Sequence, residues 1–136
     1  KAKYFAYICQ LKNIKQAQII LDLVECNLVF NSISDEIISN KVISLLIKKS
    51  DDIFIISFLI LKYVKYLTQK REKEVDKIVL NDINKALKLS PQSNNLKILK
   101  FYLYSIFDYD IEENELEYLL KSLPEESREI LSYLIK

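Results

Sequence analysis

Apolar side chains recur along this chain at helical spacing, and one segment is apolar on nearly every side. Residues 52–71 begin with an unbroken apolar run from Ile53 to Leu61 and continue without a turn residue. A length of about 20 residues suits a helix better than a strand, although isoleucine and phenylalanine favour strands. A helix that is apolar all round must be wrapped by neighbours. We therefore predict that this segment is the central helix, capped by Ser50 or Asp51.

The same segment is too short and too charged to be expected to cross a membrane. Its apolar run stops at Lys62, and Lys65 follows one turn later. Spanning a bilayer takes about 20 largely apolar residues, and lysines inside such a span are costly. We predict a buried core helix and no transmembrane segment.

Amphipathic segments on both sides supply the helices that wrap the central one. Their short connections make consecutive helices antiparallel neighbours, so the expected fold class is all-α. The predicted helices, about eight in number, cover residues 2–11, 14–30, 35–49, 52–71, 75–89, 92–107, 112–122 and a last segment from 125 to 136. Predicted inward positions include Ala17, Leu21, Val24, Leu28, Ile38, Val42, Leu45, Leu46, Val79, Asp82, Ile83, Ala86, Leu96, Leu99 and Leu103.

The chain contains no glycine and only two prolines, which changes the expected turns. Glycine is the default residue for positive φ and for tight hairpins, so its absence argues against β-sandwiches, β-barrels and Rossmann-type sheets. Asn13, Asn31 and Asn94 are the expected substitutes at sharp turns. Pro91 and Pro124 fall at predicted helix breaks, and Pro91 suits the first turn of the next helix.

Similar helix ends recur along the chain. Leu87-Lys88-Leu89-Ser90-Pro91 and Leu120-Lys121-Ser122-Leu123-Pro124 place their prolines 33 residues apart, and a period of about 34 residues marks a two-helix repeat. Residues 86–91 resemble the segment that closes a tetratricopeptide repeat. Residues 13–17 resemble that family's turn into its second helix, with Ala17 as the packed alanine. Residues 109–113 resemble the same turn, although Asn114 replaces the alanine.

The resemblance implies antiparallel helical hairpins stacked as a short right-handed solenoid. In that frame 52–71 and 92–107 are first helices of repeats, and 74–89 and 112–122 are second helices. The family's tryptophan and glycine have no match, since Phe101 stands where glycine is expected. Two phases stay open for the N-terminal part: either 2–30 is a hairpin and 35–49 an extra helix, or 2–11 ends a missing repeat.

The resemblance also implies a peptide-binding groove lined by the first helices. It places Asn95, Ile98, Tyr102 and Ser105 on the groove side of 92–107, with Lys62, Tyr63 and Tyr66 as the comparable residues of the central helix. Packing against a neighbouring helix is the competing interpretation of each tyrosine.

Several kinds of chemistry lack their residues in this sequence. There is no histidine, which removes the usual nucleophile systems and the commonest metal ligand. Without glycine there is no phosphate-binding loop. The carboxylates that remain as hard-cation candidates lack the spacing of a calcium loop and read as a solvated loop: Asp108, Asp110, Glu112, Glu113, Glu115 and Glu117. We expect no enzyme activity, no cofactor and no metal site.

Charge is unevenly distributed, although the net charge is only +1. Residues 62–100 hold ten basic and four acidic residues, a net of +6, whereas residues 108–129 have a net of −7. The basic region is the basis of an alternative function, regulatory nucleic-acid binding. The acidic end would repel phosphate, so a protein or peptide partner is the favoured expectation.

The length of 136 residues predicts a single domain, residues 1–136. Because the chain begins at Lys1 and contains no methionine, we expect it to be a fragment of a longer protein. Cys9 and Cys26 would lie too far apart along a predicted hairpin for a disulfide, which favours two free thiols and slightly favours the cytoplasm. The periplasm or cell envelope stays open, as does the oligomeric state. The abundance of isoleucine, lysine and asparagine hints at a bacterial or parasite source.

Overall fold

The computed structural model describes residues 14–32, 34–109 and 113–134, and these residues form helices and loops without a strand. The predicted all-α class is confirmed, and the predicted helix at 2–11 lies outside the described residues. The helices of the described part are α2 (Ile14–Leu28), the 3-10 turn η1 (Val29–Asn31), α3 (Asp35–Lys48), α4 (Ile53–Gln69), α5 (Val75–Leu89), α6 (Asn94–Ile106), α7 (Glu113–Ser122) and α8 (Glu125–Leu134).

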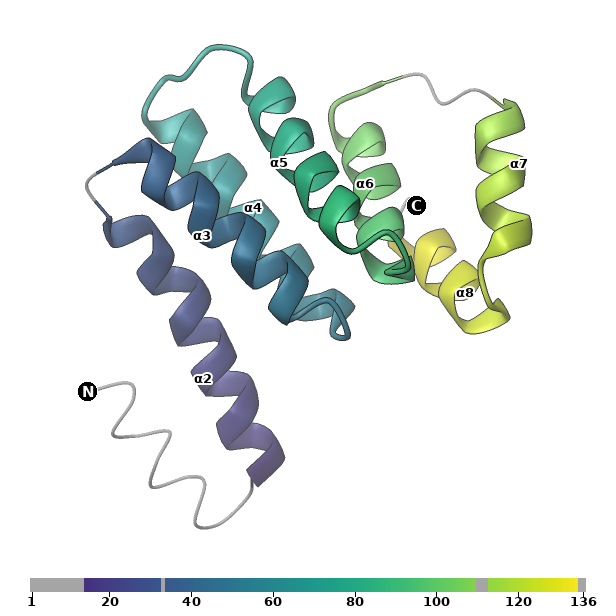
Figure 1. The fold of residues 1–136 in the computed structure, drawn as a ribbon, viewed down its shortest axis with the longest axis horizontal. Helices are drawn as coiled ribbons and strands as arrows, with labels where there is room; N and C mark the ends of the chain where they lie inside the picture. Colours follow the sequence, from purple (N-terminus) through teal and green to yellow (C-terminus); the bar gives the residue numbers. More distant parts are fainter. Residues whose placement is uncertain (1–13, 33, 110–112, 135–136) are drawn as a thin grey trace.

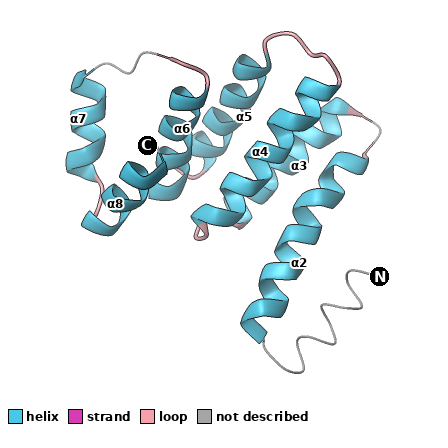
Figure 2. Ribbon diagram, turned by 180° about the vertical axis from the view of Figure 1, so that it is seen from behind, coloured by secondary structure: helices cyan, strands magenta, loops and turns pink. Residues whose placement is uncertain are grey.

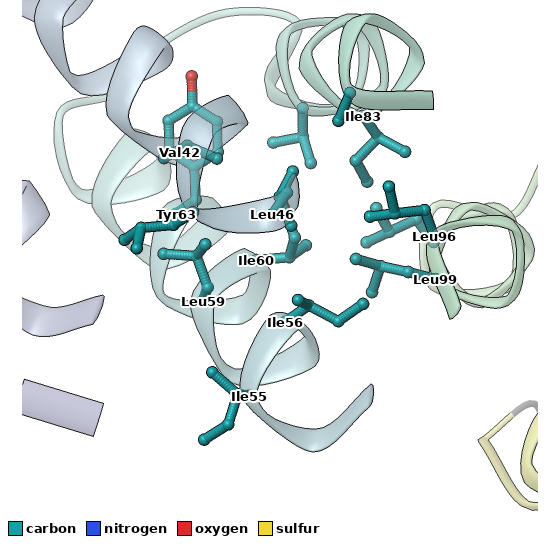
Figure 3. Close-up of a cluster of buried hydrophobic side chains, with 14 of the residues drawn as sticks. Val42, Leu46, Ile55, Ile56, Leu59, Ile60, Tyr63, Ile83, Leu96 and Leu99 are labelled. Atoms are coloured by element: carbon teal, nitrogen blue, oxygen red, sulfur yellow. The ribbon is translucent and has the colours of Figure 1, made fainter. Parts of the chain in front are cut away.

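Helix α4 is the centre of the fold, as its sequence predicts. It packs against α2, α3, α5 and α6. Its buried side chains are mostly apolar: Ile53, Ile55, Ile56, Ser57, Leu59, Ile60, Tyr63 and Leu67. Figure 3 labels five of them, Ile55, Ile56, Leu59, Ile60 and Tyr63. Because four helices cover it, most of its circumference is removed from water, which is how a helix with so few polar positions is stabilised.

Helices α2 to α6 and α8 are packed in two rows. The first row contains α2, α4, α6 and α8, and each of these helices packs on the next one. The second row contains α3 and α5, which pack on each other. Figure 1 views the molecule from the side of α3 and α5, with α4 behind them, and Figure 2 views it from the side of α4. The consecutive helices α3 and α4, α4 and α5, and α5 and α6 also pack together, so the two rows are in contact.

Side-chain caps start the two central helices of the first row. The Asp52 carboxylate accepts hydrogen bonds from the backbone N–H groups of Phe54 at 3.1 Å and Ile55 at 3.2 Å. The hydroxyl of Ser93 accepts the N–H of Leu96 at 3.2 Å. The predicted caps at Ser50 and Asp51 are therefore wrong by one or two residues. Pro91 also does not begin α6, because it lies in the turn that precedes Ser93.

The same two helices end in the same way. After α4, the N–H of Glu72 donates to Leu67 O and that of Arg71 to Thr68 O, and Arg71 has a φ of 59°. After α6, Tyr109 and Asp108 repeat both bonds, and Asp108 has a φ of 56°. This is the Schellman motif, whose left-handed position is usually glycine.

The expectation that asparagines occupy the left-handed turns is therefore corrected. In the described part of the chain the positive-φ residues are Arg71, Glu74 and Asp108. Asn94 is instead the first residue of α6, and Asn31 ends the 3-10 turn. Asn13 lies outside the described residues.

Most predicted inward positions are buried, but α2 is turned differently from its prediction. Leu28 is 45% exposed, and Leu21 and Val24 are half-buried. The α2 residues in the main core are Cys26 and, at the start of η1, Val29. Because α2 has apolar residues on most sides, its spacing does not determine which face meets α4.

Candidate functional site

The seven residues predicted to line a groove lie on two neighbouring helices, α4 and α6, which pack against each other. The structure separates them into three groups. Tyr63 and Ile98 are in the core, Asn95 and Tyr66 bridge helices, and Lys62, Tyr102 and Ser105 keep accessible surface.

Tyr63 and Ile98 do not offer a surface to a partner, which corrects the prediction for both. Tyr63 is 2% exposed and Ile98 is fully buried. The apolar body of Tyr63 packs in the main cluster, and its ring stacks on Phe30 with centroids 6.0 Å apart. Helical spacing places both residues next to exposed neighbours, but α5 and the rest of the core cover them.

Asn95 and Tyr66 hold helix ends together. The Asn95 side-chain amide donates to the backbone carbonyl of Ser50 at 2.8 Å, which ties the start of α6 to the turn between α3 and α4. The Tyr66 hydroxyl donates to Asp35 at 3.2 Å, and Lys70 donates to the same carboxylate at 2.6 Å. The hydrogen bond from the Lys70 ammonium is the main cause that lowers the pKa of Asp35 below its usual value, and the Tyr66 hydroxyl lowers it further.

A buried hydroxyl–carboxylate cluster connects α3, α4 and α5. The Tyr63 hydroxyl donates to Oδ2 of Asp82 at 2.6 Å, and the Ser39 hydroxyl donates to Oδ1 at 2.9 Å. Asp82 is only 2% exposed. Burial, followed by the hydrogen bond to Asp82, raises the pKa of Tyr63 well above its ordinary value. Tyr63 is therefore a hydrogen-bond donor at neutral pH, and the cluster joins helices rather than supplying a base or nucleophile.

A hollow of about 300 Å³ opens above this cluster. It lies between the first turns of α3, the last turns of α4 and the middle of α5, and its lining includes Asp35, Glu36, Tyr66, Asp82 and Lys85. Inside it, Tyr63 and Ser39 donate to Asp82, while Tyr66 and Lys70 donate to Asp35, so these contacts join helices.

A second surface, which the sequence did not single out, runs along the outer side of α4. Phe54 is 69% exposed and Leu61 is 44% exposed, while Phe58 between them is half-buried. Lys62 lies beside them with its Nζ 5.5 Å from the centroid of the Phe58 ring, and Lys65 is exposed one turn further on. We call these five residues the α4 stripe. Phe54, Phe58, Leu61 and Lys65 follow the i, i+4, i+7, i+11 spacing of one helix face.

The sequence alone does not identify this stripe as the exposed face of α4. Positions 54, 58 and 61 form one apolar face, yet so do 53, 56, 60 and 63 on the other side. Which face stays open depends on where the neighbouring helices pack. In this fold α2, α3, α5 and α6 leave the face of Phe54 and Leu61 uncovered.

The carboxylates at 108–117 do not gather into a site that the structure describes. Asp108 lies in the turn after α6, Glu113 and Glu117 are exposed on α7, and Asp110 and Glu112 lie outside the described residues. Among the residues described here, no group of three histidine, cysteine or acidic residues is arranged to hold a metal ion. Within the same residues, no helix has the length and apolarity needed to cross a bilayer.

The described residues thus form an all-α fold with two accessible features, the hollow above Asp82 and the α4 stripe. Comparisons with protein-family models, with curated protein sequences and with solved structures found no match.

Proposed function

We propose that this chain is a non-enzymatic protein-interaction module, built from stacked helical hairpins like those of tetratricopeptide repeats. Its binding surface is the row that contains α2, α4, α6 and α8. Stacked hairpins offer a large surface that is made of side-chain contacts and needs no reactive group, which agrees with the residues this chain has.

The packing pattern supports a repeat arrangement. Each first-row helix packs on the next first-row helix, and α3 packs on α5 in the second row. The matching Schellman ends of α4 and α6 support the assignment of both as first helices of repeats. The contact of α2 with α4 favours the phase in which α2 and α3 are one hairpin, so that 2–11 would end another repeat.

The single observation that supports binding most directly is the α4 stripe. Helix α4 packs against four other helices, yet it leaves Phe54 69% exposed and Leu61 44% exposed on one face. Exposed apolar side chains that adjoin one another, rather than being scattered, mark interaction surfaces. On α6, which packs against α4, Tyr102 is half-buried and Ser105 is exposed.

A capture experiment with matched surface variants tests this proposal. The immobilised chain is compared with Phe54→Ser/Leu61→Ser and with Leu89→Ser, which removes an equally apolar side chain that is 70% exposed on α5 in the other row. The stripe variant should lose its saturable partner while the Leu89 variant retains it, with unchanged helical circular dichroism in both. A partner that survives the stripe variant contradicts this surface.

Protein binding is favoured over nucleic-acid binding by where the basic residues lie. Those of 62–100 are spread over α4, α5, α6 and the loop at 70–74, so they belong to both rows. Lys70 is paired with Asp35, and Lys77 with Glu74. A salt titration on single-stranded and duplex nucleic acid tests the alternative, because phosphate contacts make affinity fall steeply with salt.

A further inference from the structure

We propose that the α4 stripe docks an amphipathic helix of a partner protein, with its apolar face bordered by carboxylates in the half that lies over Lys62 and Lys65. This inference names the partner chemistry for the surface proposed above and therefore rests on the proposed function. It follows from three observations on the stripe: its spacing, two lysines that form no ion pair with another described residue, and the opposite charge at its other end.

The spacing of the stripe matches a helical partner. From Phe54 to Lys65 the stripe runs along about three turns, or roughly 16 Å, of α4. An amphipathic helix presents its own apolar side chains at i, i+3, i+4 and i+7, and such a face packs into a row of this kind. Phe58 is half-buried between the more exposed Phe54 and Leu61, so the row offers three apolar side chains on successive turns.

The lysines of the stripe are available to an outside carboxylate. Lys62 and Lys65 take part in none of the ion pairs formed among the described residues. Lys62 holds its ammonium over the Phe58 ring, so its charge lies directly beside the apolar surface. A partner side chain that packs on Phe58 or Leu61 therefore comes within reach of that charge, and a neighbouring carboxylate complements it.

The other end of the stripe has the opposite charge. Phe54 lines a hollow of about 460 Å³ together with Asp51, Asn95, Glu126 and Ser127, where α4, α6 and α8 begin. Asp51 and Glu126 are both exposed. A helix that is acidic along its whole length would be repelled here, so the complementary partner has its carboxylates in one half and neutral or basic residues in the other.

The test uses defined peptides and the whole chain. Three helical peptides of about 18 residues share one apolar face and differ in its flanks. In the first, glutamates flank one half and lysines the other. The second has lysines throughout, and the third has glutamines. Fluorescence anisotropy should show the first peptide binding about tenfold more tightly than the second. The first peptide forms two exposed ion pairs with Lys62 and Lys65, whereas the lysines of the second are repelled there, and a difference of this size is expected from two such pairs.

Two variants of equal net charge make the result specific. Lys62→Glu/Lys65→Glu should abolish or invert the preference, whereas Lys85→Glu/Lys88→Glu on exposed positions of α5 should leave it unchanged. Absence of binding, equal binding of the three peptides, or a preference that survives the Lys62/Lys65 reversal overturns the inference. Sedimentation that shows a dimer dissociated by Phe54→Ser/Leu61→Ser also overturns it, because the occupant is then a second copy.

The two proposals fail in distinguishable ways. If the capture experiment shows a partner that depends on the stripe while the three peptides bind equally, the proposed interaction module stands. The proposed helix with carboxylates in one half is then wrong. If captured partners are indifferent to the stripe variant, the proposed binding surface itself is wrong.

Discussion

The hydroxyl of Tyr63 donates a hydrogen bond of 2.6 Å to the carboxylate of Asp82 across the interface between α4 and α5. Both side chains are 2% exposed, in a core that is otherwise almost wholly apolar. Ser39 on α3 donates to the second carboxylate oxygen at 2.9 Å. One buried carboxylate thus connects three helices, and each of its oxygens accepts a hydrogen bond from a different helix.

Removing the tyrosine hydroxyl should destabilise the fold. Tyr63→Phe keeps the ring in the core but leaves a buried carboxylate oxygen without its donor, which costs about 1–3 kcal/mol. Urea denaturation followed by circular dichroism should show a lower midpoint with an unchanged slope. Tyr118→Phe is the control, since Tyr118 is 76% exposed on α7 and its change should stay within about 0.5 kcal/mol.

A double-mutant cycle should attribute that cost to the pair. Asp82→Leu alone leaves the Tyr63 hydroxyl buried without an acceptor, whereas in the Tyr63→Phe background that penalty is absent. The two changes should therefore be non-additive by about 1 kcal/mol or more, with the double variant more stable than the sum predicts. Strict additivity would show that the two groups do not act as a pair.

The sequence predicted the helices and the centre of the core because both depend on local periodicity. The prediction for 75–89 matches α5, and 52–71 contains α4 with one or two extra residues at each end. Asp82 falls within the periodic pattern of 75–89, and the structure buries it. Its acceptor role was not predicted, because Tyr63 is 19 residues away and only the packing of α4 on α5 brings the two together.

The candidate surface was predicted less well than the fold, for a related reason. Tyr63 and Ile98 were expected at a groove, but their exposure depends on how far each helix is rotated about its own axis. A helix that is apolar on all sides gives no sequence signal for that rotation. The exposed faces of Phe54 and Leu61 became visible only once the covering helices were in place.

Replacing the left-handed residue after α4 by glycine should stabilise the protein. Arg71 has a φ of 59° in the Schellman motif, and an L-residue there costs about 1–2 kcal/mol, partly offset by the greater freedom of glycine in the unfolded chain. Arg71→Gly should raise the free energy of unfolding by about 0.5–1 kcal/mol. Lys73→Gly, in the same loop but outside the positive-φ positions, should give no gain, so equal effects would contradict the strain assigned to Arg71.

Removing the side chain that caps α4 should cost more stability than removing the same charge one residue earlier. Its carboxylate accepts two backbone N–H groups at the start of the central helix, so Asp52→Ala should cost about 1 kcal/mol in thermal or urea unfolding. Asp51→Ala removes the same charge from an exposed neighbour and should cost much less. Equal losses would mean that charge near the helix start matters more than the cap.

Alkaline pH should weaken the fold through Cys26. Burial, followed by the nearby carboxylates of Glu25 and Asp22, raises the pKa of this thiol from 9.0 to about 11. Between these two values the folded chain holds a proton that the unfolded chain has released, so the free energy of unfolding falls as pH rises. The contribution is complete below about pH 9 and is lost as pH approaches 11. Tyr63, whose pKa is also raised, adds to the same loss at still higher pH.

The contribution of Cys26 is isolated by comparing a chain that has this thiol with one that lacks it. In a Cys9→Ser chain kept reduced, urea midpoints are measured from about pH 8 to about pH 10.5, with and without Cys26→Ala. The Cys26→Ala chain is expected to be less stable at neutral pH, because it loses buried volume, but to decline less steeply above pH 9. Parallel pH profiles would mean that the thiol titrates alike in the folded and unfolded chain. In that case solvent would have to reach the sulfur, although Cys26 is only 1% exposed between α2 and the core.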